Sequence, residues 1–75
     1  MTVPVFLVAP EAMIGWRVSF DGAPEAHSFV DKRLAIRYAR DWAEANRPSR
    51  VVVRSREGSD EAHWDYPPLF LLRRR

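Results

Sequence analysis

The fold is decided by residues 31–46, which read DKRLAIRYARDWAEAN. This stretch is rich in alanine and contains neither glycine nor proline, so it favours a helix of several turns. Asp31 is a good N-cap, because its carboxylate can accept a hydrogen bond from a free backbone N–H of the first turn. Pro48 follows closely and pushes the residue before it out of the helical region. We therefore predict one helix from Asp31 to Asn46.

The predicted helix is amphipathic. At about 100° per residue, its apolar side carries Leu34, Ala35, Tyr38, Trp42 and Ala45, and its opposite side carries Arg33, Arg37, Arg40 and Glu44. We expect the stripe of Leu34, Tyr38 and Trp42 to pack in the core. The arginine side is typical of the solvent-exposed face of a surface helix, so it needs no function to explain it.

Two segments before the helix have the pattern of strands. Residues 3–9 form a continuous apolar run rich in β-branched side chains, which predicts a strand covered in part on both faces. Residues 16–20 alternate between apolar and polar side chains, as a half-buried strand does. Residues 26–30 give only a weak signal for a short extended piece.

After the helix, residues 50–56 and 61–66 predict a hairpin around the turn sequence EGSD. A turn centred on Gly58 and Ser59 fixes the register between the two strands. In that register three pairs share the inner face: Val53 with Trp64, Val51 with Tyr66, and Ser55 with Ala62. The outer face then pairs basic with acidic or polar residues, which supports the assignment.

Together these elements predict an α+β fold of order β-β-α-β-β. It is a four-stranded, largely antiparallel sheet with one amphipathic helix packed on one face. Residues 1–66 form the single domain, and residues 67–75 form an apolar and basic C-terminal tail. In the orientation that turns Val5 and Leu7 towards the helix, Phe6, Val8 and Val52 lie on the outer face.

Composition and charge limit the classes of function. The chain has 75 residues and no cysteine, so it is one domain without disulfides or thiolate metal ligands. The formal net charge is +2, but Arg73, Arg74 and Arg75 supply three of the twelve basic residues. Residues 1–72 therefore carry a net charge of −1, which does not describe a basic domain.

Location is predicted from the same features. The absence of cysteine fits a reducing compartment. The N-terminal residues do not have the pattern of a signal peptide, and no apolar run approaches the roughly 20 residues that span a membrane. We expect a cytoplasmic protein with no integral membrane segment.

Several short motifs occur in a recognisable order: VAP at 8–10, GWRV at 15–18, K-x-x-A-x-x-x-A-R-x-x-A at 32–43, VVV at 51–53 and EG at 57–58. In this order they resemble a family of short bacterial domains of unknown function. Its members have a V-x-P strand, a G-W-x-V strand, an alanine-rich helix and a hairpin turned at glycine. The resemblance covers about residues 7–66. It implies the same fold and supplies no catalytic residues, and the chain departs from it at 21–30 and in the tail.

One cluster has the residue types of a chemical site. Glu61, His63 and Asp65 alternate along the last strand and would share one face, where they could bind a metal or exchange a proton. His27 would be a second metal ligand only if the 21–30 connection folds back. The favoured interpretation is a solvated face with ion pairs to Arg54 and Arg56. We find no nucleophile motif and no glycine-rich phosphate loop, so we predict no enzyme, cofactor, metal or small-molecule substrate.

The first functional hypothesis is a non-enzymatic protein-interaction module, with a protein partner or a homodimer. Its predicted interface consists of apolar residues on the outer sheet face and in the tail: Phe6, Val8, Val52, Leu69, Phe70, Leu71 and Leu72. The tail has three possible places. It folds over its own sheet, packs on a second copy, or meets another partner or an anionic membrane surface.

The alternative hypothesis is a weak nucleic-acid-binding domain. Its predicted contacts are the helix and tail arginines: Arg33, Arg37, Arg40, Arg73, Arg74 and Arg75. Arginine stripes can track phosphates, and such binding falls steeply with salt. Acidic residues interrupt the stripe, and the sequence indicates no aromatic platform beside it.

Overall fold

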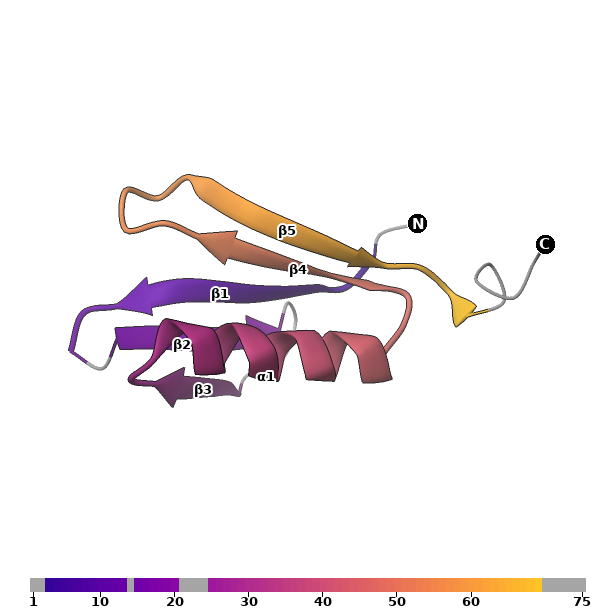
Figure 1. Cartoon of the computed structure of the whole chain (residues 1–75), viewed down its shortest axis with the longest axis horizontal. Helices are drawn as coiled ribbons and strands as arrows, with labels where there is room; N and C mark the ends of the chain where they lie inside the picture. The colour runs from indigo at the N-terminus through magenta and orange to yellow at the C-terminus, as the bar shows by residue number, and fades with distance from the viewer. Residues whose placement is uncertain (1–2, 14, 21–24, 70–75) are drawn as a thin grey trace.

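The computed structural model describes residues 3–13, 15–20 and 25–69. Within these residues the elements follow one another as β1 (Val5–Glu11), β2 (Gly15–Phe20), β3 (Ala26–Phe29), α1 (Lys32–Ala45), β4 (Ser49–Arg54) and β5 (Asp60–Tyr66). The strands form one sheet in the order β3-β2-β1-β4-β5, and α1 lies across one face of it (Figure 1). No helix in the described ranges is long and apolar enough to cross a membrane.

The predicted α+β class is confirmed, with one helix in the described chain, but the sheet has five strands rather than four. The additional strand is β3, which pairs antiparallel with β2 and sets Phe29 opposite Trp16. Its four residues have mixed polarity, so they carry little strand signal until a neighbour supplies the hydrogen bonds.

The sheet is mixed because of one pairing at its centre. β1 pairs antiparallel with β2 and parallel with β4, while β4 and β5 form an antiparallel hairpin. β3 and β4 consequently run in the same direction with two strands between them. Parallel strands need a long crossover, and α1 provides it by passing over β2 and β1.

Both predicted ends of the helix are confirmed. The Asp31 carboxylate accepts a hydrogen bond from the backbone N–H of Arg33 at 2.8 Å, which makes it the N-cap. At the other end, the Asn46 side chain donates to the carbonyl of Trp42 at 2.8 Å. The buried Ser49 hydroxyl donates to the carbonyl of Ala43 at 2.6 Å and joins the last helical turn to the start of β4.

The helix packs on the sheet through small side chains. The helical residues fully buried there are Ala35, Ala39 and Ala43. The predicted core stripe of Leu34, Tyr38 and Trp42 lies one position away from these alanines, and it is wrong at Leu34, which is 54% exposed. Tyr38 and Trp42 instead pack from the flank, where β3 widens the sheet and gives them partners. Alanine at the centre lets the helix backbone approach the sheet closely.

An aromatic cluster fills the space between this flank and the sheet. The ring centroid of Phe6 lies 4.7 Å from that of Phe20 and 4.8 Å from that of Trp42. Tyr38 lies 5.3 Å from Phe29 of β3. These separations are within the usual range for aromatic pairs in cores, so the cluster joins β1, β2 and β3 to the helix.

The predicted orientation of β1 is wrong. Phe6 is 1% exposed and Val8 is 0% exposed, so both face the helix and neither belongs to an exposed surface. They lie opposite Val51 and Val53 of β4, and the residue between them, Leu7, faces away. β1 lies at the centre of the sheet and is apolar on both sides, so its residues do not alternate in polarity.

The predicted register of the β4–β5 hairpin is wrong by two residues. The structure pairs Val53 with Ala62 and Val51 with Trp64. The turn residues explain the shift: the Gly58 N–H donates to the Ser55 carbonyl at 3.0 Å, and Gly58 has a φ of 92° that favours glycine. A register irregularity follows between Val53 and Arg54. Because two residues is one full period of a strand, residues 62–66 keep their predicted faces despite the error.

Candidate functional site

The sheet face turned away from the helix is the first candidate site, and we call it the open face. Its described residues are Val5, Leu7, Ala9 and Glu11 of β1, Arg17 and Ser19 of β2, Ala26 and Ser28 of β3, Arg50, Val52 and Arg54 of β4, and His63 and Asp65 of β5. α1 lies on the opposite side (Figure 1). No other described element packs on this face.

The centre of the open face is apolar. Leu7 of β1 lies directly opposite Val52 of the neighbouring strand, and Val5 and Ala9 continue the patch along β1. All four side chains are half-buried by their neighbours within the sheet. Of the residues predicted to form an apolar interface, Val52 is therefore correctly placed, whereas Phe6 and Val8 are replaced by Val5 and Leu7.

Ion pairs surround this apolar centre. Arg17 lies 3.7 Å from Glu11 on one side of the face. On the other side, Arg50 Nε donates to Asp65 Oδ1 at 2.5 Å, and Arg54 lies 3.5 Å from Asp60. Each pair joins one cation to one anion, so the rim has no formal net charge. The hydrogen bond from Arg50 is the main cause that lowers the pKa of the Asp65 carboxyl below its ordinary value.

A hollow of about 590 Å³ opens at one end of the open face. It is lined mainly by apolar and ring side chains, including Val3, Val5, Pro48 and Pro67. Leu69, which was predicted to be part of the interface, is 58% exposed just beyond it in the chain. Phe70, Leu71 and Leu72 lie outside the described residues, as do Arg73, Arg74 and Arg75.

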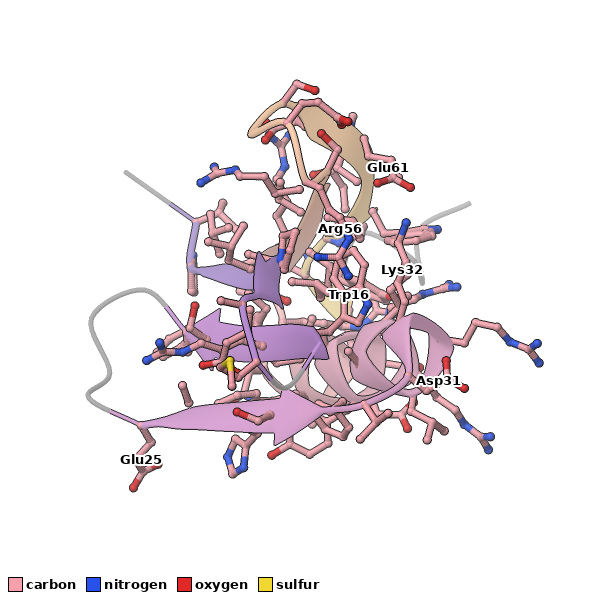
Figure 2. The ribbon with its side chains drawn as sticks, turned by 90° about the vertical axis from the view of Figure 1, so that its left-hand side faces the viewer. Trp16, Glu25, Asp31, Lys32, Arg56 and Glu61 are labelled. Atoms are coloured by element: carbon pink, nitrogen blue, oxygen red, sulfur yellow. The ribbon has the colours of Figure 1, made fainter. Side chains whose placement is uncertain are left out.

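The predicted cluster of Glu61, His63 and Asp65 does not share one face. The irregular register at the start of β5 turns Glu61 towards the helix, where its carboxylate binds Lys32 Nζ at 2.5 Å (Figure 2). His63 Nε2 stays on the open face, 3.8 Å from the Asp65 carboxylate. The described ranges contain no group of three or more histidine, cysteine or acidic side chains that could hold a metal ion.

A second charged cluster lies at the N-terminal end of the helix. Lys32 Nζ lies 5.0 Å from the ring centroid of Trp16, and the guanidinium of Arg56 lies 5.3 Å from it (Figure 2). Lys32 also binds Glu61. These contacts close the β4–β5 hairpin over the edge of the core, so a structural role accounts for them.

The second candidate site is a groove between α1 and the edge strand β5, which we call the arginine groove. Its volume is about 630 Å³, and its lining residues are Arg33, Ile36, Arg37, Arg40, Asp41, Glu44, Arg47, Trp64 and Tyr66. It exists because the helix covers the middle of the sheet and leaves the inner face of β5 only partly covered. The structure therefore brings the three predicted helix arginines together with two aromatic residues of a distant strand.

Two of the four arginines that line the groove, Arg40 and Arg47, are held by the aromatic residues. Arg40 Nε donates to the Tyr66 hydroxyl at 2.7 Å, and the Arg40 guanidinium lies 4.6 Å from the centroid of the Trp64 ring. Arg47 lies 5.3 Å from the Tyr66 ring and donates to the carbonyl of Pro67 at 3.0 Å. The groove thus has one ordered wall of stacked cations and rings.

No local pattern in the sequence indicates this wall. The expectation that no aromatic platform lies beside the arginines is wrong, because Trp64 and Tyr66 were assigned only to the core. Trp64 is in fact half-buried at the sheet edge. The signal that could have found it is the alternation of the last strand combined with the width of the sheet.

No known protein family, curated protein or solved structure matches this chain in the comparisons made. The two surfaces described above are therefore the basis for any statement about function.

Proposed function

We propose that the chain is a non-enzymatic protein-interaction module that associates with a second copy of itself through the open face. The observation that carries the proposal is the patch of Val5, Leu7 and Val52 at the centre of a sheet face that no other described element covers. A patch of this kind, surrounded by charged residues, has the arrangement of a protein interface: an apolar centre inside a polar rim.

The charge of the open face supports a second copy as the partner. The rim consists of three internal ion pairs, formed by Glu11 with Arg17, Arg50 with Asp65, and Arg54 with Asp60. Two such faces do not repel each other by net charge, and each carries the apolar area that the other needs. Sheets that pack face to face lie about 10 Å apart with their side chains interdigitating, so two copies would form a sandwich with helices outside.

The hollow beside Val5 makes the open face concave at one end, so that a partner side chain can enter it. A partner side chain that is buried in such a hollow contributes more than one on a flat rim. The hollow is lined by side chains of β1, β4 and β5 and by the prolines that follow β5. A cytoplasmic location is part of this proposal and rests on the sequence features given above.

The experiment is light scattering with size-exclusion chromatography over low micromolar to millimolar protein. We expect the wild-type chain to shift from monomer to dimer as its concentration rises. Leu7→Glu should weaken the dimer by about 2 kcal/mol or more, or roughly thirtyfold in Kd, because it buries a charge at the centre of the interface. A wild-type chain that stays monomeric at millimolar concentration would contradict the proposal.

Leu34→Glu is the matched control, because Leu34 is an exposed leucine on the helix and far from the open face. It changes the net charge by the same amount and should leave the dimer intact. Val52→Glu is a second test on the open face, and thermal melting of each variant shows that it is folded. If Leu7→Glu and Val52→Glu both dimerise like the wild type, the open face is not the interface.

A further inference from the structure

We propose that the arginine groove binds single-stranded nucleic acid, with the helix arginines on the phosphates and the wall of Trp64 and Arg40 against a base. This site lies on the other side of the sheet from the open face and does not depend on the proposed dimer. It rests on three features of the groove: two arginines without an ion-pair partner among the described residues, the wall of Arg40 and Trp64, and an excess of positive charge.

The first feature is a pair of uncommitted guanidinium groups. Arg33 and Arg37 are exposed, and neither forms an ion pair with another residue in the described part of the chain. They lie four residues apart on α1, so their side chains leave the same flank about 6 Å apart along the axis. Such a row can follow successive phosphates of one strand.

The second feature is the wall formed by Arg40 and Trp64. The guanidinium of Arg40 lies over the indole of Trp64 and donates one hydrogen bond to the Tyr66 hydroxyl. This bond uses only one of the five N–H groups of the arginine. A planar guanidinium on a ring is a surface on which an unstacked base can lie, and its remaining N–H groups can donate hydrogen bonds to that base. Side chains already held in place lose little entropy when a ligand binds.

The third feature is the balance of charge. Four arginines line the groove against two carboxylates, Asp41 and Glu44. Glu44 lies 4.0 Å from Arg47, which partly neutralises both groups. The remaining excess is positive but small, so the affinity should be modest and strongly dependent on salt.

These features favour a single strand over two other anionic partners. A base in a duplex is stacked inside the helix and cannot reach the wall of Arg40 and Trp64, whereas a single strand exposes its bases. An acidic peptide would use the arginines but has no group for the wall. The volume of about 630 Å³ is in the range of sites for molecules of about nucleotide size.

The test measures fluorescence anisotropy of fluorescein-labelled oligothymidylate with the full chain at several salt concentrations. The double variant R33Q/R37Q should bind about tenfold more weakly at low salt. Its plot of log K against log salt should be shallower by about 1.4, since each lost phosphate contact on a single strand removes about 0.7. The control R17Q/R54Q removes two arginines from the open face and should bind like the wild type.

Trp64→Leu tests the aromatic wall separately. It should lower the affinity by about fivefold or more, because the Arg40 guanidinium loses the ring that holds it against the base. The salt slope should stay unchanged, since contact with a base releases no counterions. Trp64→Phe keeps a ring and should retain most of the binding.

Three results would overturn the proposal. The first is an equal loss of binding in R33Q/R37Q and R17Q/R54Q, which would mean attraction by charge alone. The second is tighter binding of the corresponding duplex than of the single strand. The third is equally tight binding of polyglutamate that is lost in R33Q/R37Q and kept in Trp64→Leu, which would identify an acidic peptide as the partner.

Discussion

The two faces of the sheet are built from the same strands but are organised differently. On the face covered by α1, Phe6, Val8 and Val53 are almost completely buried, and aromatic side chains fill the flank. On the open face, Leu7 and Val52 are half-buried, and charged pairs surround them. Residues 6 and 7 are neighbours in the chain, yet one lies in the core and the other at a surface.

The difference teaches where the stability of a 75-residue domain resides. Such a domain has one core and a small net free energy of folding, of the order of 5 kcal/mol or somewhat more. The covered face must supply most of that, because only there are side chains removed from water on all sides. The open face can then carry residues selected for contact with a partner.

The largest expected effect compares these two neighbours directly. Phe6→Ala should lower the free energy of unfolding by about 3–5 kcal/mol, through lost burial and the cavity left beside Trp42. Leu7→Ala should lower it by only about 1 kcal/mol, because the side chain is half-exposed in the folded monomer. Urea denaturation monitored by circular dichroism measures both. Equal losses would mean that the open face is as important for the monomer as the covered face.

The next effect compares two alanines, one on each side of the sheet. Ala39→Leu should cost about 1–3 kcal/mol, because the fully buried alanine lets the helix lie close to the sheet and leaves no space for a larger side chain. Ala9→Leu on the open face should change stability by less than about 0.5 kcal/mol. Thermal melting of the two variants at one low concentration measures the difference. A stable Ala39→Leu variant would show that the helix can move away from the sheet.

Local sequence signals were enough to predict the helix, and long-range pairing decided what they missed. The N-cap at Asp31 and the stop at Asn46 depend on neighbouring residues, so both ends were correct. The orientation of β1 depends on its position between β2 and β4, which a run of apolar residues does not reveal. β3 forms only because β2 offers it hydrogen bonds. The hairpin register was missed because the left-handed φ of Gly58 determines the turn.

For the candidate sites, too, local patterns predicted the exposure of single residues but not which residues meet. The exposure of Arg33, Arg37 and Arg40 follows from helical periodicity and is confirmed. Their position beside Trp64 depends on where the helix lies across the sheet. No local sequence pattern predicts that position. Val52 was placed on the outer face because its strand alternates, whereas Phe6 and Val8 were misplaced because theirs does not.

The smallest expected effect concerns the charged rim of the open face, at Asp65. The hydrogen bond from Arg50 is the largest cause that lowers the pKa of this carboxyl below its ordinary value of 3.8. Desolvation opposes it as the second cause, and the charges of Arg50 and His63 lower the pKa further. A carboxyl whose pKa is lower in the folded state than in the unfolded state stabilises the fold at every pH above the unfolded pKa. That stabilisation is lost as the pH falls through the folded pKa, so Asp65 changes the pH dependence of stability only below about pH 4. Since Asp65 is exposed, the change in stability should be small.

Arg50→Gln should return the pKa of Asp65 towards 3.8 in a carbon-13 NMR titration of the carboxyl group. Arg17→Gln, on the other side of the face, should leave that titration unchanged; a shift in both variants would mean that the general charge of the face, rather than the bond from Arg50, sets the pKa.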